Sequence, residues 1–385
     1  MEQILSGVYS VGVFDKNIDL FEGMYSVPEG ISYNSYLVCD KKIAIMDSVD
    51  ANFRDEWLNN IHSVLGERKP DYLVILHMEP DHSANILSFI KAYPDAQIVG
   101  NAKTLVMIKE FFGEDFSFNF LEVQDGQSLD LGGRKLNFIF APMVHWPEVM
   151  VAYDSVDKAL FSADAFGKFG ARVCGKQWES EARRYYYGIV GKFGAQVQIL
   201  FKKLSCLEIK KIFPLHGPFL TENVDFYFDK YEKWSKYEPE TNGVLIAYTS
   251  IYGHTASAAK TLALMLKEKN VCEVELCDLA RCDWAECVAQ AFKFKNTVLA
   301  TTTYNGDVFP AMREFIDRLK ERNFQNRRIG LIENGSWAPV AARNMQKRLE
   351  GCKNLEYCEN GVKIRSALNA ESTAQLERLA YELSK

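Results

Sequence analysis

The sequence predicts an α/β protein of two domains, the second built on a parallel sheet with helices on both faces. The chain has 385 residues, and at roughly 100–200 residues per domain this length suggests two or three domains. A polar stretch over 229–243, with Pro239 and Gly243, is the most suitable boundary. We therefore expect one domain over residues 1–240 and another over 241–385.

The first half alternates short apolar runs with turns and occasional helical patterns. The run Tyr72 to Leu76 is typical of a buried strand and is followed at once by the segment HMEPDH. Three later apolar runs end in the same way, at or just before His145, Asp164 and His216. If these four strands share a sheet, their terminal side chains converge on one of its edges.

These side chains are candidate metal ligands. They are His77, Glu79, Asp81, His82, His145, Asp164 and His216. A single one of them could be a helix cap or a turn residue, but four of the six histidines occur in this set together with three carboxylates. Such donors suit two metals with one bridging carboxylate. Zinc accepts them, and carboxylate-rich sites with open positions also suit redox-active iron.

The second half alternates strand, loop and helix, which predicts a doubly wound parallel sheet. GVLIAYTS precedes HTASAAKTLALMLKEK, NTVLATTT precedes a helix from about Pro310, and RIGLIENGS precedes APVAARNMQKRLEG. The loop after the first of these strands is rich in hydroxyls and contains Gly253. Hydroxyls and backbone amides at a helix N-terminus are suited to surround a phosphate group.

Composition excludes some functions. Hydrophobic residues make up 48% and charged residues 25%, as in ordinary globular proteins. The net charge of −6 argues against nucleic acid, because phosphate binding needs a basic surface. No apolar run approaches the ~18 residues of a membrane span, and the N-terminal segment lacks the features of a signal peptide. We expect a cytoplasmic protein that does not bind membranes.

The nine cysteines are scattered and contain no C-x-x-C pair. Four of them recur every five residues, at Cys272, Cys277, Cys282 and Cys287, but this spacing fits no common zinc or iron–sulfur pattern. We therefore predict free, reduced thiols throughout, including Cys174.

The pattern H-x-E-x-D-H, followed by spaced His, Asp and His, resembles that of the flavodiiron proteins. It is the metallo-β-lactamase motif H-x-H-x-D-H with Glu79 in place of the second histidine. The stretch GISYNSYLV, residues 30–38, also resembles a family segment. The resemblance implies a metallo-β-lactamase-like αββα sandwich followed by a flavodoxin-like domain. It further implies one iron on His77, Glu79 and His145, another on Asp81, His82 and His216, and Asp164 as the bridge between them.

Tyr25 is a candidate catalytic donor beside the metals, and a buried structural tyrosine is an equally open interpretation. The loop after the first strand of the second half looks like the FMN-phosphate loop of flavodoxins, and two later loops fit the same site, with Tyr304 and Trp337 as candidate ring contacts. The predicted FMN-binding residues are Thr249, Ser250, Ile251, Tyr252, Gly253, His254, Thr255, Thr302, Thr303, Tyr304, Asn305, Gly306, Asn334, Gly335, Ser336 and Trp337.

The implied activity is reduction of dioxygen to water, of nitric oxide to nitrous oxide, or both. Two ferrous ions and one reduced FMN would supply the four electrons that dioxygen needs. Since the chain lacks C-x-x-C pairs, an external donor must supply electrons, and rubredoxin is the usual donor in the family. The resemblance also implies a head-to-tail homodimer or a dimer of dimers. Two alternatives stay open: a dizinc hydrolase, and a flavodoxin-type electron carrier without catalysis.

Overall fold

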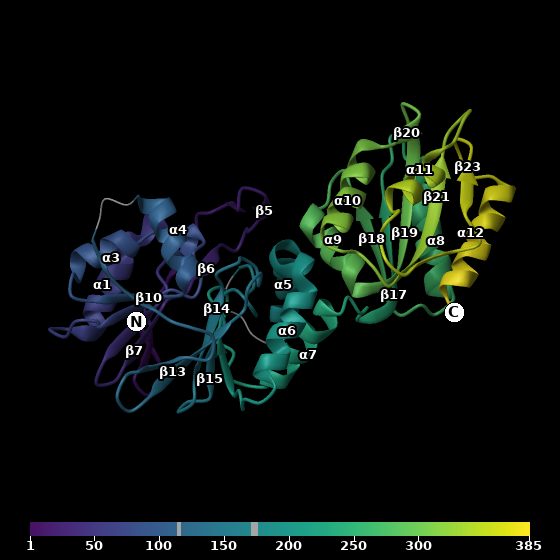
Figure 1. The fold of residues 1–385 in the computed structure, drawn as a ribbon. Coiled ribbons are helices and arrows are strands. Elements are labelled where there is room, and N and C mark those ends of the chain that lie inside the picture. Colours follow the sequence, from purple (N-terminus) through teal and green to yellow (C-terminus); the bar gives the residue numbers. More distant parts are fainter. Residues whose placement is uncertain (114–116, 171–175) are drawn as a thin grey trace. The chain divides into compact units, whose positions relative to one another are not determined.

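The computed structural model describes residues 1–113, 117–170 and 176–385. The chain divides into two compact units, Met1–Glu232 and Lys233–Lys385, which Figure 1 distinguishes by colour along the sequence. The boundary expected between residues 240 and 241 falls within the second unit. Cys174 lies outside the described residues.

The first unit contains two main sheets. The first sheet consists of β1 (Glu2–Leu5), β2 (Val8–Ser10), β7 (Tyr36–Cys39), β8 (Ile43–Met46), β9 (Tyr72–Val74), β10 (Gln97–Gly100) and β11 (Asn119–Glu122), hydrogen-bonded in that order. The second consists of β12 (Ser128–Asp130), β13 (Lys135–Phe140), β14 (Met150–Asp154), β15 (Ala159–Phe161) and β16 (Lys211–Phe213). Two short pairs join β3 (Val13–Asp15) to β6 (Ile31–Tyr33) and β4 (Leu20–Phe21) to β5 (Tyr25–Ser26).

Helices cover both sheets of this unit. They are α1 (Arg54–Leu65), α2 (Pro80–Ser83), α3 (Ile86–Ala92), α4 (Ala102–Phe112), α5 (Lys176–Tyr185), α6 (Gly194–Leu204) and α7 (Val224–Ser235). In Figure 1, α1, α3 and α4 lie beside the first sheet, and α5, α6 and α7 lie beside the second. Helix α1 is an example of an amphipathic helix. Its buried residues Trp57, Ile61 and Leu65 recur every fourth position and so form one apolar face. The layers confirm the αββα sandwich.

The four strands that end near candidate ligands do not share one sheet. Strand β9 belongs to the first sheet, whereas β13, β15 and β16 belong to the second. Strands β15 and β16 are parallel, and β13 and β15 are both antiparallel to β14, so all three end at the same edge of the second sheet. Met150 N donates to Leu76 O just beyond β9, at 3.1 Å. The candidate ligands therefore follow strand ends of both sheets, whereas the sequence suggested a single sheet.

The second unit is a parallel sheet. Its strands are β18 (Val274–Asp278), β17 (Thr241–Tyr248), β19 (Phe294–Tyr304), β21 (Arg327–Asn334) and β22 (Leu355–Tyr357), in that spatial order. Strand β23 (Val362–Ile364) is parallel to β21, and the short β20 (Asp307–Val308) is antiparallel to β19. The sheet order second–first–third–fourth–fifth is that of flavodoxin-like folds.

Helices pack on both faces of this sheet. They are α8 (His254–Glu268), α9 (Trp284–Lys293), α10 (Pro310–Glu321), α11 (Ala341–Arg348) and α12 (Ala370–Leu383). Helices α8 and α12 share one core with the sheet. On the other face, α10 contacts both α9 and α11. Residues 244–247 of β17 are fully buried, as expected for a strand covered on both faces. The predicted doubly wound, flavodoxin-like fold is confirmed.

In the part of the chain that the structure describes, no helix combines the length and the hydropathy needed to cross a membrane.

The segment between β6 and β7 clamps the loop that follows β16. The side-chain amide of Asn34 donates to Pro214 O at 2.8 Å and to Gly217 O at 3.0 Å. Its backbone N–H donates to Leu215 O at 2.8 Å, and Gly217 N donates to Ser32 Oγ at 2.6 Å. Asn34 is fully buried. Four hydrogen bonds therefore fix the backbone on both sides of His216.

We predict that Asn34→Ala lowers the free energy of unfolding by ~1–3 kcal/mol, because it removes two buried hydrogen bonds, to the carbonyls of Pro214 and Gly217. Asn52→Ala is the matched control, since the Asn52 side chain is exposed and bonds only locally to Asp50. Urea unfolding measures both variants. Equal, small effects of the two substitutions would contradict the clamp.

Candidate functional site

The structure gathers the seven candidate metal ligands into two adjoining groups. One group holds His77, Glu79, His145 and Asp164, and the other holds Asp81, His82 and His216. Within each group the donor atoms all lie within 4.8 Å of one another. The composition of the groups matches the division that the family resemblance implies, while the ligand role of each residue stays a proposal.

Imidazole nitrogens and carboxylate oxygens face one another in the first group. His145 Nε2 lies 3.1 Å from Glu79 Oε2 and 3.1 Å from Asp164 Oδ2. His77 Nε2 lies 3.2 Å from Glu79 Oε2 and 3.6 Å from Asp164 Oδ2. Four donor atoms therefore surround one point.

The second group faces the other oxygen of Asp164. His82 Nε2 and His216 Nε2 lie 3.0 Å apart, and each lies 3.3 Å from Asp81 Oδ2. Asp164 Oδ1 is 3.2 Å from the His82 nitrogen and 3.7 Å from that of His216. Two imidazole nitrogens bound to one cation at ~2.1 Å lie about 3–3.4 Å apart. Asp164 thus offers one oxygen to each group.

Two of the imidazoles are oriented by bonds on their outer nitrogens. His77 Nδ1 lies 2.8 Å from Glu148 Oε1, which also accepts from Met78 N at 2.8 Å. His216 Nδ1 lies 2.8 Å from Ser32 O. Such bonds fix the ring and its tautomer, so that Nε2 points toward a metal. Sequence analysis missed Glu148, although an acidic residue three positions after His145 was an available signal.

The charges in this buried cluster compensate one another. Burial opposes ionisation of Asp164, but the charge of His82, the hydrogen bond from His145 and the charge of His77 outweigh it and hold the pKa of this carboxyl well below its usual range. Burial likewise disfavours the charged form of His145, yet its bonds to Asp164 and Glu79 raise the pKa to about 9. A proton on the His145 imidazole therefore offsets carboxylate charge, and a bound cation would replace that proton.

Several polar atoms of the cluster have no hydrogen-bond partner among the described residues. They are both carboxylate oxygens of Asp81, Asp164 Oδ1 and His82 Nδ1, and all are buried. Buried polar groups without partners are costly, and a cation in the second group would be a partner for Asp81 and for Asp164 Oδ1. The donor set and its geometry therefore fit two metal ions bound by nitrogen and oxygen.

The tyrosine that sequence analysis proposed beside the metals and a second tyrosine differ in what they contact. Tyr185 was not predicted: its ring centroid lies 5.5 Å from that of His216, and its buried hydroxyl has no hydrogen-bond partner in the described part of the chain. Burial and then the charge of Asp164 raise its pKa well above the usual value, so the hydroxyl keeps its proton and can donate. Tyr185 ends α5, where a π-helical turn begins at Tyr186. The predicted Tyr25 donates its hydroxyl to Gly188 O at 2.8 Å.

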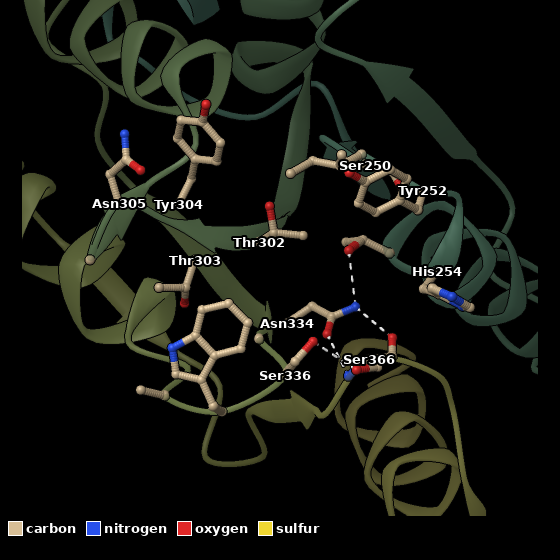
Figure 2. A pocket seen from close by; sticks show the side chains of 16 residues that line it. Ser250, Tyr252, His254, Thr302, Thr303, Tyr304, Asn305, Asn334, Ser336 and Ser366 are labelled. Carbon is tan, nitrogen blue, oxygen red and sulfur yellow. Dashed lines mark hydrogen bonds between the residues drawn. The ribbon is translucent and has the colours of Figure 1, made fainter.

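The second unit contains a cavity of about 690 Å³, within the range of small-molecule sites. Figure 2 shows side chains entering it from three loops: Ser250 to His254 on one side, Thr302 to Asn305 on the other, and Asn334 with Ser336 between them. Fourteen of the sixteen predicted FMN-binding residues line this cavity. The two that do not, Thr249 and Gly253, support its wall.

The wall beside α8 is built to receive an anion. Gly253 precedes the helix with φ of +89°, and no side chain caps the first amides of α8. Just before the helix, Gly253 N donates to Ser250 Oγ at 3.1 Å. Beside this loop, the hydroxyls of Thr249 and Thr301 lie 2.6 Å apart. The uncapped N–H groups of a helix are a favourable site for a phosphate.

Sequence analysis missed Ser366, which also lines the cavity. Ser366 O accepts from Asn334 Nδ2 at 2.9 Å, and its Oγ lies 2.8 Å from that of Ser336. Across the cavity mouth, Tyr252 and Trp337 are each 89% exposed. The cavity thus combines an anion-binding end with exposed aromatic rings, which fits a phosphorylated, planar cofactor such as FMN.

Comparisons with known proteins show similarity over both units of the chain. A sequence model described as "ODP family beta lactamase" matches residues 31–217. The chain is 29% identical to the nitric oxide reductase of Moorella thermoacetica, over 99% of this chain and 96% of that protein. It is 27% identical to the rubredoxin-oxygen oxidoreductase of Megalodesulfovibrio gigas, over 100% and 97%.

A solved structure shows the same fold throughout. The flavodiiron protein from Giardia intestinalis superposes with a TM-score of 0.93 at 27% identity, covering 100% of this chain and 95% of that one. Relatives and solved structure cover nearly the whole chain, and so include both the residues that gather the candidate ligands and those that line the cavity. Over nearly its whole length the chain is therefore similar to a nitric oxide reductase, a rubredoxin-oxygen oxidoreductase and a flavodiiron protein.

Proposed function

We propose that this protein is a flavodiiron oxidoreductase that reduces dioxygen to water, nitric oxide to nitrous oxide, or both. Residues 1–240 form the metal-binding domain and residues 241–385 the FMN-binding domain. The observation that carries the proposal is Asp164, whose two oxygens face two separate groups of metal-binding side chains. The names of similar proteins, a nitric oxide reductase and a rubredoxin-oxygen oxidoreductase, support the choice of substrates.

Each residue of the cluster has a definite task in this proposal. His77, Glu79 and His145 would hold one iron, Asp81, His82 and His216 would hold the other, and Asp164 would serve both. Bound iron and FMN supply the electrons, four in all when both are reduced. Glu148 and Ser32 orient the imidazoles, and the Tyr185 hydroxyl, which stays protonated, is placed to donate a hydrogen bond at the cluster.

Electrons enter from an external carrier, and rubredoxin is our proposed donor. The eight described cysteines are all free, and free thiols suit a reducing compartment, so we propose that the reaction takes place in the cytoplasm.

A dizinc hydrolase is the second candidate, because zinc accepts the same nitrogen and oxygen ligands. It leaves the cavity of the second unit without a role. A flavodoxin-type electron carrier, the third candidate, leaves seven converging ligands without one.

We expect protein produced with sufficient iron to contain about two irons and one FMN per chain, from the two ligand groups and the single cavity. Dioxygen, nitric oxide or both should rapidly reoxidise the fully reduced protein. Metal and flavin analysis followed by stopped-flow absorbance with each gas in turn measures this.

Zinc-loaded protein is the control, since zinc has no redox chemistry. Two zincs with full activity in the absence of iron would establish the hydrolase instead, and FMN without metal would establish the carrier.

We predict that Asp164→Ala removes most of the metal from both groups and lowers turnover by about 100-fold or more, because even the loss of an outer partner of a metal ligand costs ~10–100-fold. Glu79→Ala should deplete mainly the group that contains His77 and His145. Iron content and turnover are compared with those of Asp130→Ala, an exposed carboxylate paired with Lys135. Both site variants should keep their FMN. Full iron content in Asp164→Ala would disprove the bridge.

We further propose a head-to-tail homodimer in which the FMN of one chain serves the irons of the other. An isologous interface forms two such pairs by symmetry. The test mixes two inactive parents: Asp164→Ala, which lacks the bridge, and a Gly253→Val/Thr255→Ala variant of the phosphate loop. Valine is strained at the φ of +89° that Gly253 adopts.

After dissociation and reassociation, mixed dimers should regain up to about half of the activity of the wild-type dimer, because one of the two symmetric pairs is intact. The wild-type protein carried through the same procedure is the control. Mixed dimers that form but stay inactive would show that electrons do not cross between chains.

A further inference from the structure

Three of the four regularly spaced cysteines come together in the second unit. Cys277 lies in β18, Cys282 in the turn after it, and Cys287 in the first turns of α9. Their sulfur atoms all lie within 4.8 Å of one another. Cys272, the fourth of the series, precedes β18 and lines a different cavity, together with Asn242 and Asn270.

The backbone explains how residues five positions apart meet. Arg281 N and Cys282 N both donate to Asp278 O, at 2.9 and 2.8 Å, so the chain turns sharply after β18. Asp283 then caps α9 by accepting from Ala285 N at 2.7 Å. Cys287 N donates to Asp283 O at 3.1 Å. A strand end, a tight turn and a capped helix therefore each deliver one sulfur to the same place.

The cluster is enclosed on all sides but one. Cys287 is fully buried and Cys277 nearly so, whereas Cys282 is partly exposed. Each sulfur lies within hydrogen-bonding reach of the other two. A ligand would therefore enter from the side of Cys282.

Three sulfurs arranged in this way match the needs of one soft cation. Metal–sulfur bonds of ~2.3 Å place the sulfurs of a tetrahedral or trigonal site about 3.8–4.0 Å apart. A disulfide joins only two sulfurs, at ~2.05 Å, and would leave the third without a role. Sulfur ligands select Zn²⁺ and Cu⁺ over harder cations, which distinguishes this cluster from the nitrogen and oxygen donors around Asp164.

We propose that Cys277, Cys282 and Cys287 bind one soft, thiophilic metal ion as three thiolates, with Zn²⁺ or Cu⁺ as the natural occupant. Binding exchanges thiol protons for the metal, up to three per ion, and involves no change of oxidation state. The inference is independent of the function proposed for the metal cluster of the first unit. It differs from the expectation of unoccupied free thiols that the five-residue spacing suggested.

The test adds Co²⁺ to the full-length protein after anaerobic reduction with a phosphine and removal of the reductant. Thiolate ligands give Co²⁺ an intense near-ultraviolet charge-transfer band, which nitrogen and oxygen ligands do not. We expect this band to saturate at one ion per chain and to disappear when Zn²⁺ is added. No thiolate band in the wild-type protein would overturn the proposal.

Cys282→Ser is the informative variant, because its side chain is partly exposed and its loss leaves the buried pair in place. We expect its Co²⁺ affinity to fall at least about tenfold. Cys272→Ser, in the same segment but outside the cluster, is the matched control and should keep the full band. Asp164→Ala should also keep it, which separates this site from the first unit. A band of undiminished affinity in Cys282→Ser would overturn the proposal.

A second measurement does not depend on any variant. Zn²⁺ should slow alkylation of Cys282 by iodoacetamide in the wild-type protein, with the labelled cysteine identified by peptide mass spectrometry. The exposed Cys272 serves as the internal reference. Equal alkylation rates of Cys282 with and without Zn²⁺ would count against the site as firmly as a missing band.

Discussion

The buried carboxylate of Asp164 is the interaction on which the first unit depends. An isolated ionised carboxylate in a protein interior is very costly, and this one is almost fully buried. It is tolerated because its two oxygens face different imidazole groups, which share its charge. To face Asp164, the imidazoles need strand ends of two sheets to lie close together. The Asn34 bonds hold the backbone on both sides of His216 and so keep its ring beside Asp164. The same arrangement that keeps the carboxylate charged also prepares it for two cations.

Much of the candidate metal site could be predicted because its side chains lie at or shortly after the ends of apolar runs, and a strand end is a local feature of sequence. What could not be predicted is which strands are neighbours. The first sheet supplies His77 and its companions while the second supplies His145, Asp164 and His216, a pairing that depends on long-range packing. Ser32 was missed because it contacts His216 through its backbone carbonyl, a group that every residue possesses. Tyr185 sits in no motif and is brought to the cluster by a helix distant in sequence.

The second unit was more predictable, since strand, loop and helix alternate with little insertion and the cavity of a doubly wound sheet lies beyond the carboxyl ends of its strands. Ser366 escaped because it follows the short edge strand β23, which carries a weak sequence pattern. For the cysteines, the sequence did not indicate that Cys277, Cys282 and Cys287 lie together. Their regular spacing matched no known ligand motif, yet three of them meet, because strand, turn and helix advance by different distances per residue. Regular spacing in sequence alone therefore does not say which of these sulfurs lie close together.

The exposed rings at the mouth of the cavity also affect how the chain behaves in solution. Tyr252 and Trp337 each present most of their surface to water, and apolar area of this kind costs about 25 cal/mol for each Å² left unburied. A planar cofactor seated between such rings would cover much of that area. With the cavity empty, both rings would stay in contact with water, and exposed apolar surface promotes self-association. Filling the cavity would then affect the solubility of the chain as well as its chemistry.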